Sequence, residues 1–124
     1  MKQEEKILLL KDLCARLAYQ PICEFMDTED DFCTATAALG YSLRDFIAGK
    51  VIIKPYLRPM ETMTEDEREE YENLCLFYGC KAYSSNTVIA YELIDWLISH
   101  HFDCRGLIPM CIALEAPEGM YKIN

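Results

Sequence analysis

The stretch Gly49-Lys50-Val51-Ile52-Ile53-Lys54-Pro55 decides the expected fold, because it carries the clearest strand signal in the chain. Its β-branched residues, Val51 to Ile53, lie between a Gly-Lys pair and a proline, and this arrangement is typical of a β-strand bounded by turns. Since helical patterns flank this strand on both sides, the sequence predicts a mixed fold class.

Two segments upstream are also short and β-prone: Ile22 to Met26 and Phe32 to Tyr41, with the polar turn Asp27 to Asp31 between them. Together with the first stretch they predict a β-rich part over about residues 22–57, with about three strands in an antiparallel meander. Ser42 to Ala48 could form a helical turn instead.

Residues 3–18 show the pattern of an amphipathic helix. The apolar residues at helical spacing, which predict its buried face, are Leu10, Leu13, Cys14 and Leu17. Most charged side chains of this segment, including Asp12 and Arg16, are expected on other faces. Pro21 ends the helix, because the residue before a proline is disfavoured in the α region.

Residues 64–78 form the best-marked helix. Thr64 and Glu67 match a capping box, in which each side chain can satisfy a backbone N–H of the other residue. The expected apolar face comprises Tyr71, Leu74, Cys75 and Tyr78.

A third helix is predicted over residues 87–101, and its wide apolar arc suggests that it is the most buried helix. In the C-terminal segment 102–124, Asp103 could cap a short helix over Arg105 to Leu114. We therefore expect one small α+β domain over residues 1–124, with about three helices packed on a short antiparallel β-meander.

The charge balance excludes some function classes. The chain has 124 residues, with 12 Lys and Arg against 21 Asp and Glu, which gives a net charge of −9. An apolar content of 52% is too high for an acidic disordered tail. General nucleic-acid binding needs cations that displace phosphate counterions, so the net negative charge argues against a direct nucleic-acid partner. No run approaches the ~20 apolar residues that span a bilayer, so we expect no membrane partner.

The seven cysteines are odd in number and cannot all pair within the chain. The charged N-terminus and the short apolar run Ile7 to Leu10 do not match a secretory signal peptide, whose core has about 7–15 apolar residues. We therefore expect free thiols and a cytoplasmic location.

Three phrases occur in a fixed order along the chain. They are LLKDLCARL (Leu9 to Leu17), then IKPYLRPM (Ile53 to Met60) with MTE (Met63 to Glu65), then Asp95-Trp96-Leu97, His101-Phe102-Asp103, RGLI (Arg105 to Ile108) and ALEAPEGMY (Ala113 to Tyr121). In this order they resemble a family of short uncharacterised proteins of Bacteroides-type gut bacteria and their phages or prophages. The resemblance implies a mobile-element origin and a bacterial cytoplasm, and it carries no established activity.

One group of residues could supply the four N or S donors of a tetrahedral zinc site. These weak candidate metal ligands are Cys75, Cys80, His101 and Cys104. Because Cys75 falls within the apolar face of a predicted helix, ordinary core and surface thiols are the simpler interpretation, and we expect no cofactor. Ser84 and Ser85 lack a nucleophile-elbow motif and are better explained as helix caps.

Acidic residues gather in two segments. Seven carboxylates lie between Glu61 and Glu72 with Arg68 as the one cation among them, and four lie between Asp27 and Asp31. The simpler interpretation is a solvated helix face and an acidic turn. The functional one is an anionic surface for a basic partner. The expected interaction residues are Tyr56, Arg58, Glu65, Asp66, Glu69, Glu70, Phe102 and Arg105.

These patterns predict a non-enzymatic acidic interaction protein of phage or mobile-element origin, which binds a host or phage protein. A counter-defence or host-takeover inhibitor is one version. One alternative is a small metal-binding regulator or enzyme that uses the Cys75, Cys80, His101 and Cys104 cluster. Another is a structural or assembly protein that acts as a homo-oligomer.

Overall fold

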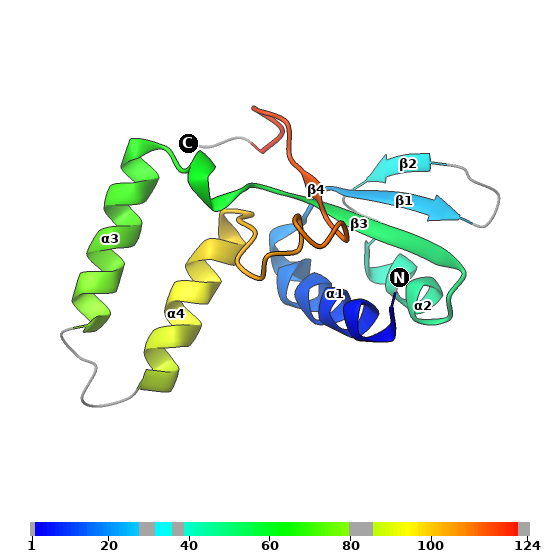
Figure 1. Ribbon diagram of the computed structural model, residues 1–124, viewed down its shortest axis with the longest axis horizontal. Coiled ribbons are helices and arrows are strands. Elements are labelled where there is room, and N and C mark those ends of the chain that lie inside the picture. The colour runs from blue at the N-terminus through cyan, green and yellow to red at the C-terminus, as the bar shows by residue number, and fades with distance from the viewer. Residues whose placement is uncertain (1, 28–31, 36–38, 80–85, 122–124) are drawn as a thin grey trace.

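The computed structural model describes residues 2–27, 32–35, 39–79 and 86–121 (Figure 1). In chain order the elements are α1 (Gln3–Arg16), a 3₁₀ turn (Leu17–Tyr19), β1 (Cys23–Asp27), β2 (Phe32–Ala35), α2 (Leu39–Ile47), β3 (Val51–Leu57), a second 3₁₀ turn (Met60–Thr62), α3 (Glu65–Gly79), α4 (Asn86–Ser99) and β4 (Leu114–Glu115). The predicted α+β class is confirmed, and α1, α3 and α4 match the three expected helices.

The described strands form one sheet in the order β2-β1-β3-β4. β1 pairs antiparallel with both β2 and β3, whereas β4 pairs parallel with β3. Each of the three segments predicted as strands contains a strand, but the second ends at Ala35, and Leu39 to Tyr41 belong to α2 instead. Because β1 lies between the other two strands, they do not form a sequential meander. The chain passes from β2 to β3 through α2, which gives the region around Ser42 the helical structure left open above.

β3 continues through Pro55, where the sequence pattern placed its end. Ile53, Pro55 and Leu57 are buried, while the residues between them are less so. Tyr56 donates its backbone N–H to the Ile22 carbonyl at 2.8 Å, so strand alternation points the Pro55 nitrogen away from β1. Since β4 pairs with β3 only from Tyr56 onward, proline costs no sheet hydrogen bond here.

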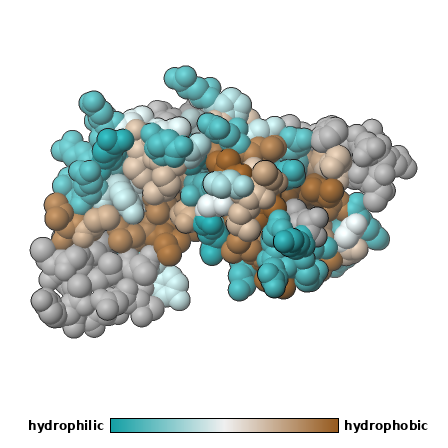
Figure 2. Space-filling model, viewed as in Figure 1, coloured by the Kyte–Doolittle hydropathy of each residue, from teal (hydrophilic) through white to brown (hydrophobic). Residues whose placement is uncertain are grey.

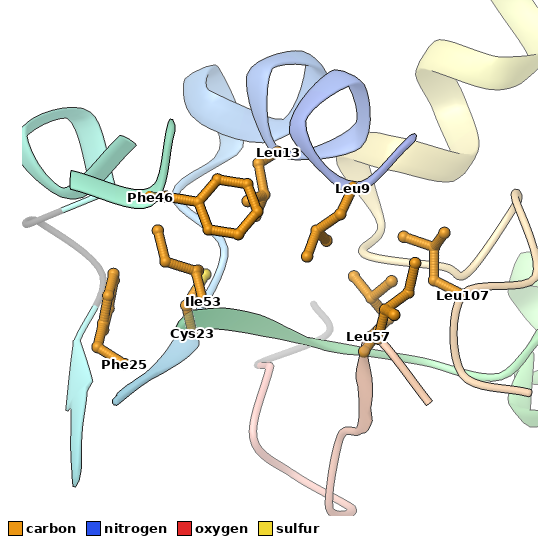
Figure 3. Close-up of a cluster of buried hydrophobic side chains, with 10 residues drawn as sticks. Leu9, Leu13, Cys23, Phe25, Phe46, Ile53, Leu57 and Leu107 are labelled. Atoms are coloured by element: carbon orange, nitrogen blue, oxygen red, sulfur yellow. The ribbon is translucent and has the colours of Figure 1, made fainter. Parts of the chain in front are cut away.

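α1 and α2 cover one face of the sheet, and the main core lies between these two helices and the sheet (Figures 1 and 3). Residues 107–113 close this core from the C-terminal side. Its buried side chains are Leu9, Leu13, Cys23, Phe25, Phe46, Ile53, Leu57, Leu107, Ile112 and Ala113.

The buried face of α1 differs from the predicted one. The buried residues of this helix are Leu9, Asp12, Leu13 and Arg16. Cys14 is exposed and Leu17 is 40% exposed, although both were expected to face the core. The helix can bury Asp12 and Arg16 because the two side chains form an ion pair at i, i+4 spacing.

α3 and α4 pack against each other and extend away from the sheet (Figure 1). Trp96, Leu97 and Phe102 form a second buried cluster, and Tyr71 and Leu74 of α3 pack against it. Among the described side chains of α4, burial is confined to its C-terminal end.

Two large apolar side chains of α4 remain exposed: Tyr91 at 70% and Ile94 at 41%. The expectation that this helix is the most buried is therefore wrong for the part that the structure describes. The cause is that α4 has the second cluster at one end instead of a sheet along its length.

The segment after α4 forms turns instead of the short helix considered over Arg105 to Leu114. The two carboxylate oxygens of Asp103 accept the backbone N–H groups of Leu107 at 2.8 Å and Ile108 at 3.0 Å. Gly106 has a φ of 72° and Cys111 a φ of 63°, and such left-handed conformations interrupt a right-handed helix. Asp103 therefore caps a turn.

Candidate functional site

Arg58 joins the end of β3 to α3. Its Nη1 and Nη2 atoms donate to Glu67 Oε2 at 2.8 Å and Oε1 at 2.7 Å, a bidentate pair. Nη1 also donates to the His100 carbonyl at 3.0 Å, and the guanidinium lies 4.2 Å from the centroid of the Phe102 ring. Arg58 therefore contacts α3 through Glu67, and it contacts the segment after α4 through the His100 carbonyl and the Phe102 ring.

The predicted capping box holds Glu67 in place for this pair. Glu67 donates its backbone N–H to Thr64 Oγ1 at 3.1 Å, and Thr64 donates its own N–H to Glu67 Oε1 at 3.0 Å. Burial alone would raise the pKa of Glu67, but the hydrogen bonds from Arg58 and Thr64 lower it below its ordinary value. The carboxylate therefore stays ionised.

A second buried ion pair lies on α1. Arg16 Nε donates to Asp12 Oδ2 at 2.6 Å, and both side chains are 0% exposed. Arg16 Nη2 reaches Asp12 Oδ1 at 3.2 Å and the Phe102 carbonyl at 2.7 Å. Phe102 therefore contacts two guanidinium groups. That of Arg58 lies over its ring, and that of Arg16 donates to its carbonyl. We call Asp12, Arg16, Arg58, Glu67 and Phe102 the buried junction.

His101 and Tyr121 stack at the edge of the buried junction. Their ring centroids are 3.7 Å apart and the planes differ by 8°. Burial, followed by the positive charges of Arg16 and Arg58, lowers the pKa of His101 to about 4. The imidazole is therefore neutral at neutral pH, which avoids a third positive charge at the junction.

The Tyr121 hydroxyl ties the C-terminal segment to the sheet. It donates to the Tyr56 carbonyl at 2.7 Å and accepts the Ile22 N–H at 2.9 Å. Burial raises the pKa of Tyr121 to about 12, so the hydroxyl keeps its proton. This contact is structural.

The expected aromatic–arginine interaction segment lies mostly in the interior. Phe102 is 0% exposed and Arg58 is 8% exposed, so the prediction that they offer a binding surface is wrong. Tyr56 is half-buried and donates its hydroxyl to Glu24 at 3.1 Å. Arg105 lies at the surface, where its Nε contacts Asp12 Oδ1 at 3.2 Å. The cations of this segment pair within the molecule and are not free for a partner.

The expected acidic residues of α3 do lie on a surface. Glu65, Asp66, Glu69 and Glu70 are all exposed, and we call them the acidic face. Glu70 accepts the Trp96 Nε1–H at 3.1 Å, which fixes one of these carboxylates against α4. In Figure 2 hydrophilic side chains gather at the upper left, where Figure 1 places the start of α3. The structure brings these four predicted residues together.

A hollow of about 450 Å³ lies along the acidic face. Its lining residues are Asp66, Glu69, Glu70, Asn73 and Leu74. Farther along α3, Leu76 is 68% exposed. Carboxylates and apolar side chains therefore share one surface of the helix.

The proposed metal ligands do not form a recognisable site in the part of the chain that the structure describes, where no three His, Cys, Asp or Glu side chains gather as ligands. Cys80 lies outside the described residues. His101 stacks on Tyr121, and Cys104 has its Sγ 4.0 Å from Arg16 Nη2. Burial raises the pKa of Cys104, which disfavours the thiolate that zinc binding needs.

Ser84 and Ser85, predicted as helix caps, lie outside the described residues. Asp103 uses both carboxylate oxygens to accept backbone N–H groups. Asp103 thus acts as a turn cap.

Sequence reasoning missed the central role of Asp12 and Arg16. Their i, i+4 spacing was a usable signal, because an acid and a base at that spacing can neutralise each other on one helix face. It did not find the His101–Tyr121 stack either, since no local pattern links residues 20 positions apart in a turn-rich segment.

Within the described ranges, no helix combines the length and apolar character needed to cross a bilayer. Comparison of the chain with protein-family models, curated proteins and solved structures found no significant match.

Proposed function

We propose that this chain is a non-enzymatic protein-binding module that uses the acidic face of α3 to engage a basic surface on a partner protein. The observation that carries the proposal is the set of exposed carboxylates Glu65, Asp66 and Glu69, which make no ion pair within the described residues and lie next to a hollow. Carboxylates on such a face steer a positively charged partner and set its orientation.

The buried junction supports the same proposal by fixing α3. Glu67, on the inner side of the helix, is anchored to Arg58, and Glu70 is held by Trp96. A face held rigidly before binding loses less conformational entropy when a partner docks. The acidic face also disfavours a second copy of α3 in the same place, because like charges would meet.

The origin that the sequence resemblance implies gives this proposal its biological setting. A phage-encoded or prophage-encoded protein in a bacterial cytoplasm would meet host proteins with basic nucleic-acid-binding surfaces. Inhibition of such a host protein is the version of the function that we favour.

Affinity capture with charge-reversal variants tests the proposal. The tagged protein, its Glu65→Lys/Glu69→Lys variant and a Glu4→Lys/Glu118→Lys variant would be incubated with a lysate of a Bacteroides-type bacterium. The two variants carry the same net charge, and each reverses one first-turn carboxylate, because Glu4 opens α1 as Glu65 opens α3.

We expect at least one protein to be recovered by the parent chain and the control variant but lost with the α3 variant. Recovery of the same proteins by all three chains, or of none by any, would overturn the proposal. Far-UV circular dichroism and urea unfolding would verify that the variants remain folded.

A further inference from the structure

We infer that the occupant of the α3 hollow is a cationic amphipathic helix of the partner, which places Lys or Arg against Asp66 and Glu69 and an apolar side chain against Leu76. This inference rests on the proposed function, because it names the chemistry of the partner segment. It goes beyond charge attraction, because it assigns cationic contacts to Asp66 and Glu69 and an apolar contact to the other end of this surface of α3.

The spacing of the lining residues supports a helical occupant. Asp66, Glu69 and Asn73 line the hollow, and Leu76 continues their spacing of three or four residues, so the four residues form one stripe along α3. At 1.5 Å per residue the stripe is about 15 Å long, close to three helical turns. The stripe is acidic at its start and apolar at its end, and the hollow of about 450 Å³ lies along residues 66–74.

The floor of the hollow explains why an apolar group belongs there. Leu74 is half-buried because it packs against the Trp96 cluster on its inner side, and the hollow exposes its outer side. Leu76, one turn beyond Asn73, is 68% exposed. A partner leucine or similar side chain would remove Leu76 from water, as in helix-in-groove recognition. A separate aliphatic group would cover Leu74, because residues two apart lie on different sides of a helix.

The acidic end determines the charge of the occupant. A Lys or Arg side chain can place its aliphatic stem on Leu74 while its cation reaches Asp66 or Glu69. A second copy of this chain is a poorer occupant, because each copy carries a net charge of −9.

Fluorescence anisotropy with a labelled peptide tests the inference. The probe is a helical peptide of about 18 residues with Lys and Leu on one face and Ala and Gln elsewhere. Two matched peptides replace every Lys by Glu or every Leu by Ser. The protein variants are Asp66→Asn/Glu69→Gln, Leu76→Ser and the control Glu4→Gln/Glu118→Gln.

We expect the Lys–Leu peptide to bind, the two matched peptides to bind more weakly, and the Asp66→Asn/Glu69→Gln variant to weaken binding about five-fold. Leu76→Ser should also weaken it, and the control variant should bind as the parent chain does. Amide shifts in ¹⁵N–¹H spectra should concentrate between residues 66 and 76. Since Leu76 is largely exposed, its replacement should leave the urea midpoint nearly unchanged.

Several results would overturn the inference. If the peptide affinity depends on its Lys residues but is unchanged by Leu76→Ser and by replacement of the peptide Leu residues, binding is charge attraction only. Dimerisation of the parent chain in light scattering that Leu76→Ser abolishes would assign the surface to a second copy. Lysate capture that depends on α3, without any peptide binding, would sink this inference and leave the proposed function standing.

Discussion

Replacement of Asp12 by alanine tests the buried junction most directly. Asp12 and Arg16 are both 0% exposed, and two of the guanidinium nitrogens contact the carboxylate, at 2.6 Å and 3.2 Å. Asp12→Ala leaves the Arg16 charge buried without its counter-ion, and breaking a buried pair in this way costs about 3–5 kcal/mol. The contact from Arg105 adds little, because that side chain is 34% exposed and solvent screens the pair.

A loss of this size is large for a small domain, whose free energy of unfolding is about 5–15 kcal/mol. Urea unfolding followed by circular dichroism would measure the loss, and the thermal midpoint should fall by roughly 10–20 °C. The exposed control Glu4→Ala should change stability by less than about 0.5 kcal/mol.

A double variant shows whether the stability loss of Asp12→Ala comes from the lost counter-ion or from the lost side-chain volume. Asp12→Leu/Arg16→Met removes both charges. The Phe102 carbonyl then loses its Arg16 donor but keeps the Cys104 N–H at 3.0 Å, at a cost of about 1–3 kcal/mol. The double variant should therefore be more stable than Asp12→Ala. If Asp12→Ala costs less than about 1 kcal/mol, or if the double variant is the less stable of the two, the reasoning about the buried junction is wrong.

Three further predictions concern single side chains. The pKa of His101 falls from 6.5 in the unfolded chain to about 4 in the folded protein, so its contribution to stability is complete above pH 6.5 and is lost as the pH falls toward 4. His101→Asn, which tolerates the φ of 65°, should reduce this loss in urea midpoints measured against pH, and identical profiles would contradict the prediction. Thr64→Ala should cost about 1 kcal/mol in urea unfolding because α3 loses its cap, whereas Thr64→Ser should be nearly neutral; equal costs would argue against the cap. Tyr121→Phe should cost about 1–3 kcal/mol because two backbone groups lose their partner, and an unchanged unfolding midpoint would count against that role.

The local elements could be predicted because their signals are local. Thr64 and Glu67 lie three residues apart and make the hydrogen bonds that the capping box requires. Val51 to Ile53 begin β3 because β-branched residues suit an extended backbone. Such features depend on near neighbours in the chain.

The strand order could not be predicted because it depends on distant contacts. Nothing in β1 alone specifies that it pairs with both β2 and β3. The crossover through α2 decides the order, and α2 was only one of two interpretations of the region around Ser42. Pairing between strands is set by the surface that the whole sheet buries.

The candidate site was predicted in part. Glu65, Asp66, Glu69 and Glu70 were correctly placed on a surface, because a run of acids with a single cation among them is expected in water. Arg58 and Phe102 were expected among the interaction residues, but both are buried. Their burial depends on Glu67 and the His100 carbonyl, which lie far from Arg58 in the chain or on another element.

The Tyr121 contacts bear on the order in which the protein can fold. This residue bonds to Ile22 beside β1 and to Tyr56 in β3, and Leu107 and Ile112 complete the core under α1. During synthesis α1 leaves the ribosome before these residues exist, and Arg16 has no Phe102 carbonyl to bind. The nascent chain therefore remains incompletely folded, and accessible to chaperones and proteases, until residues 107–121 have been released.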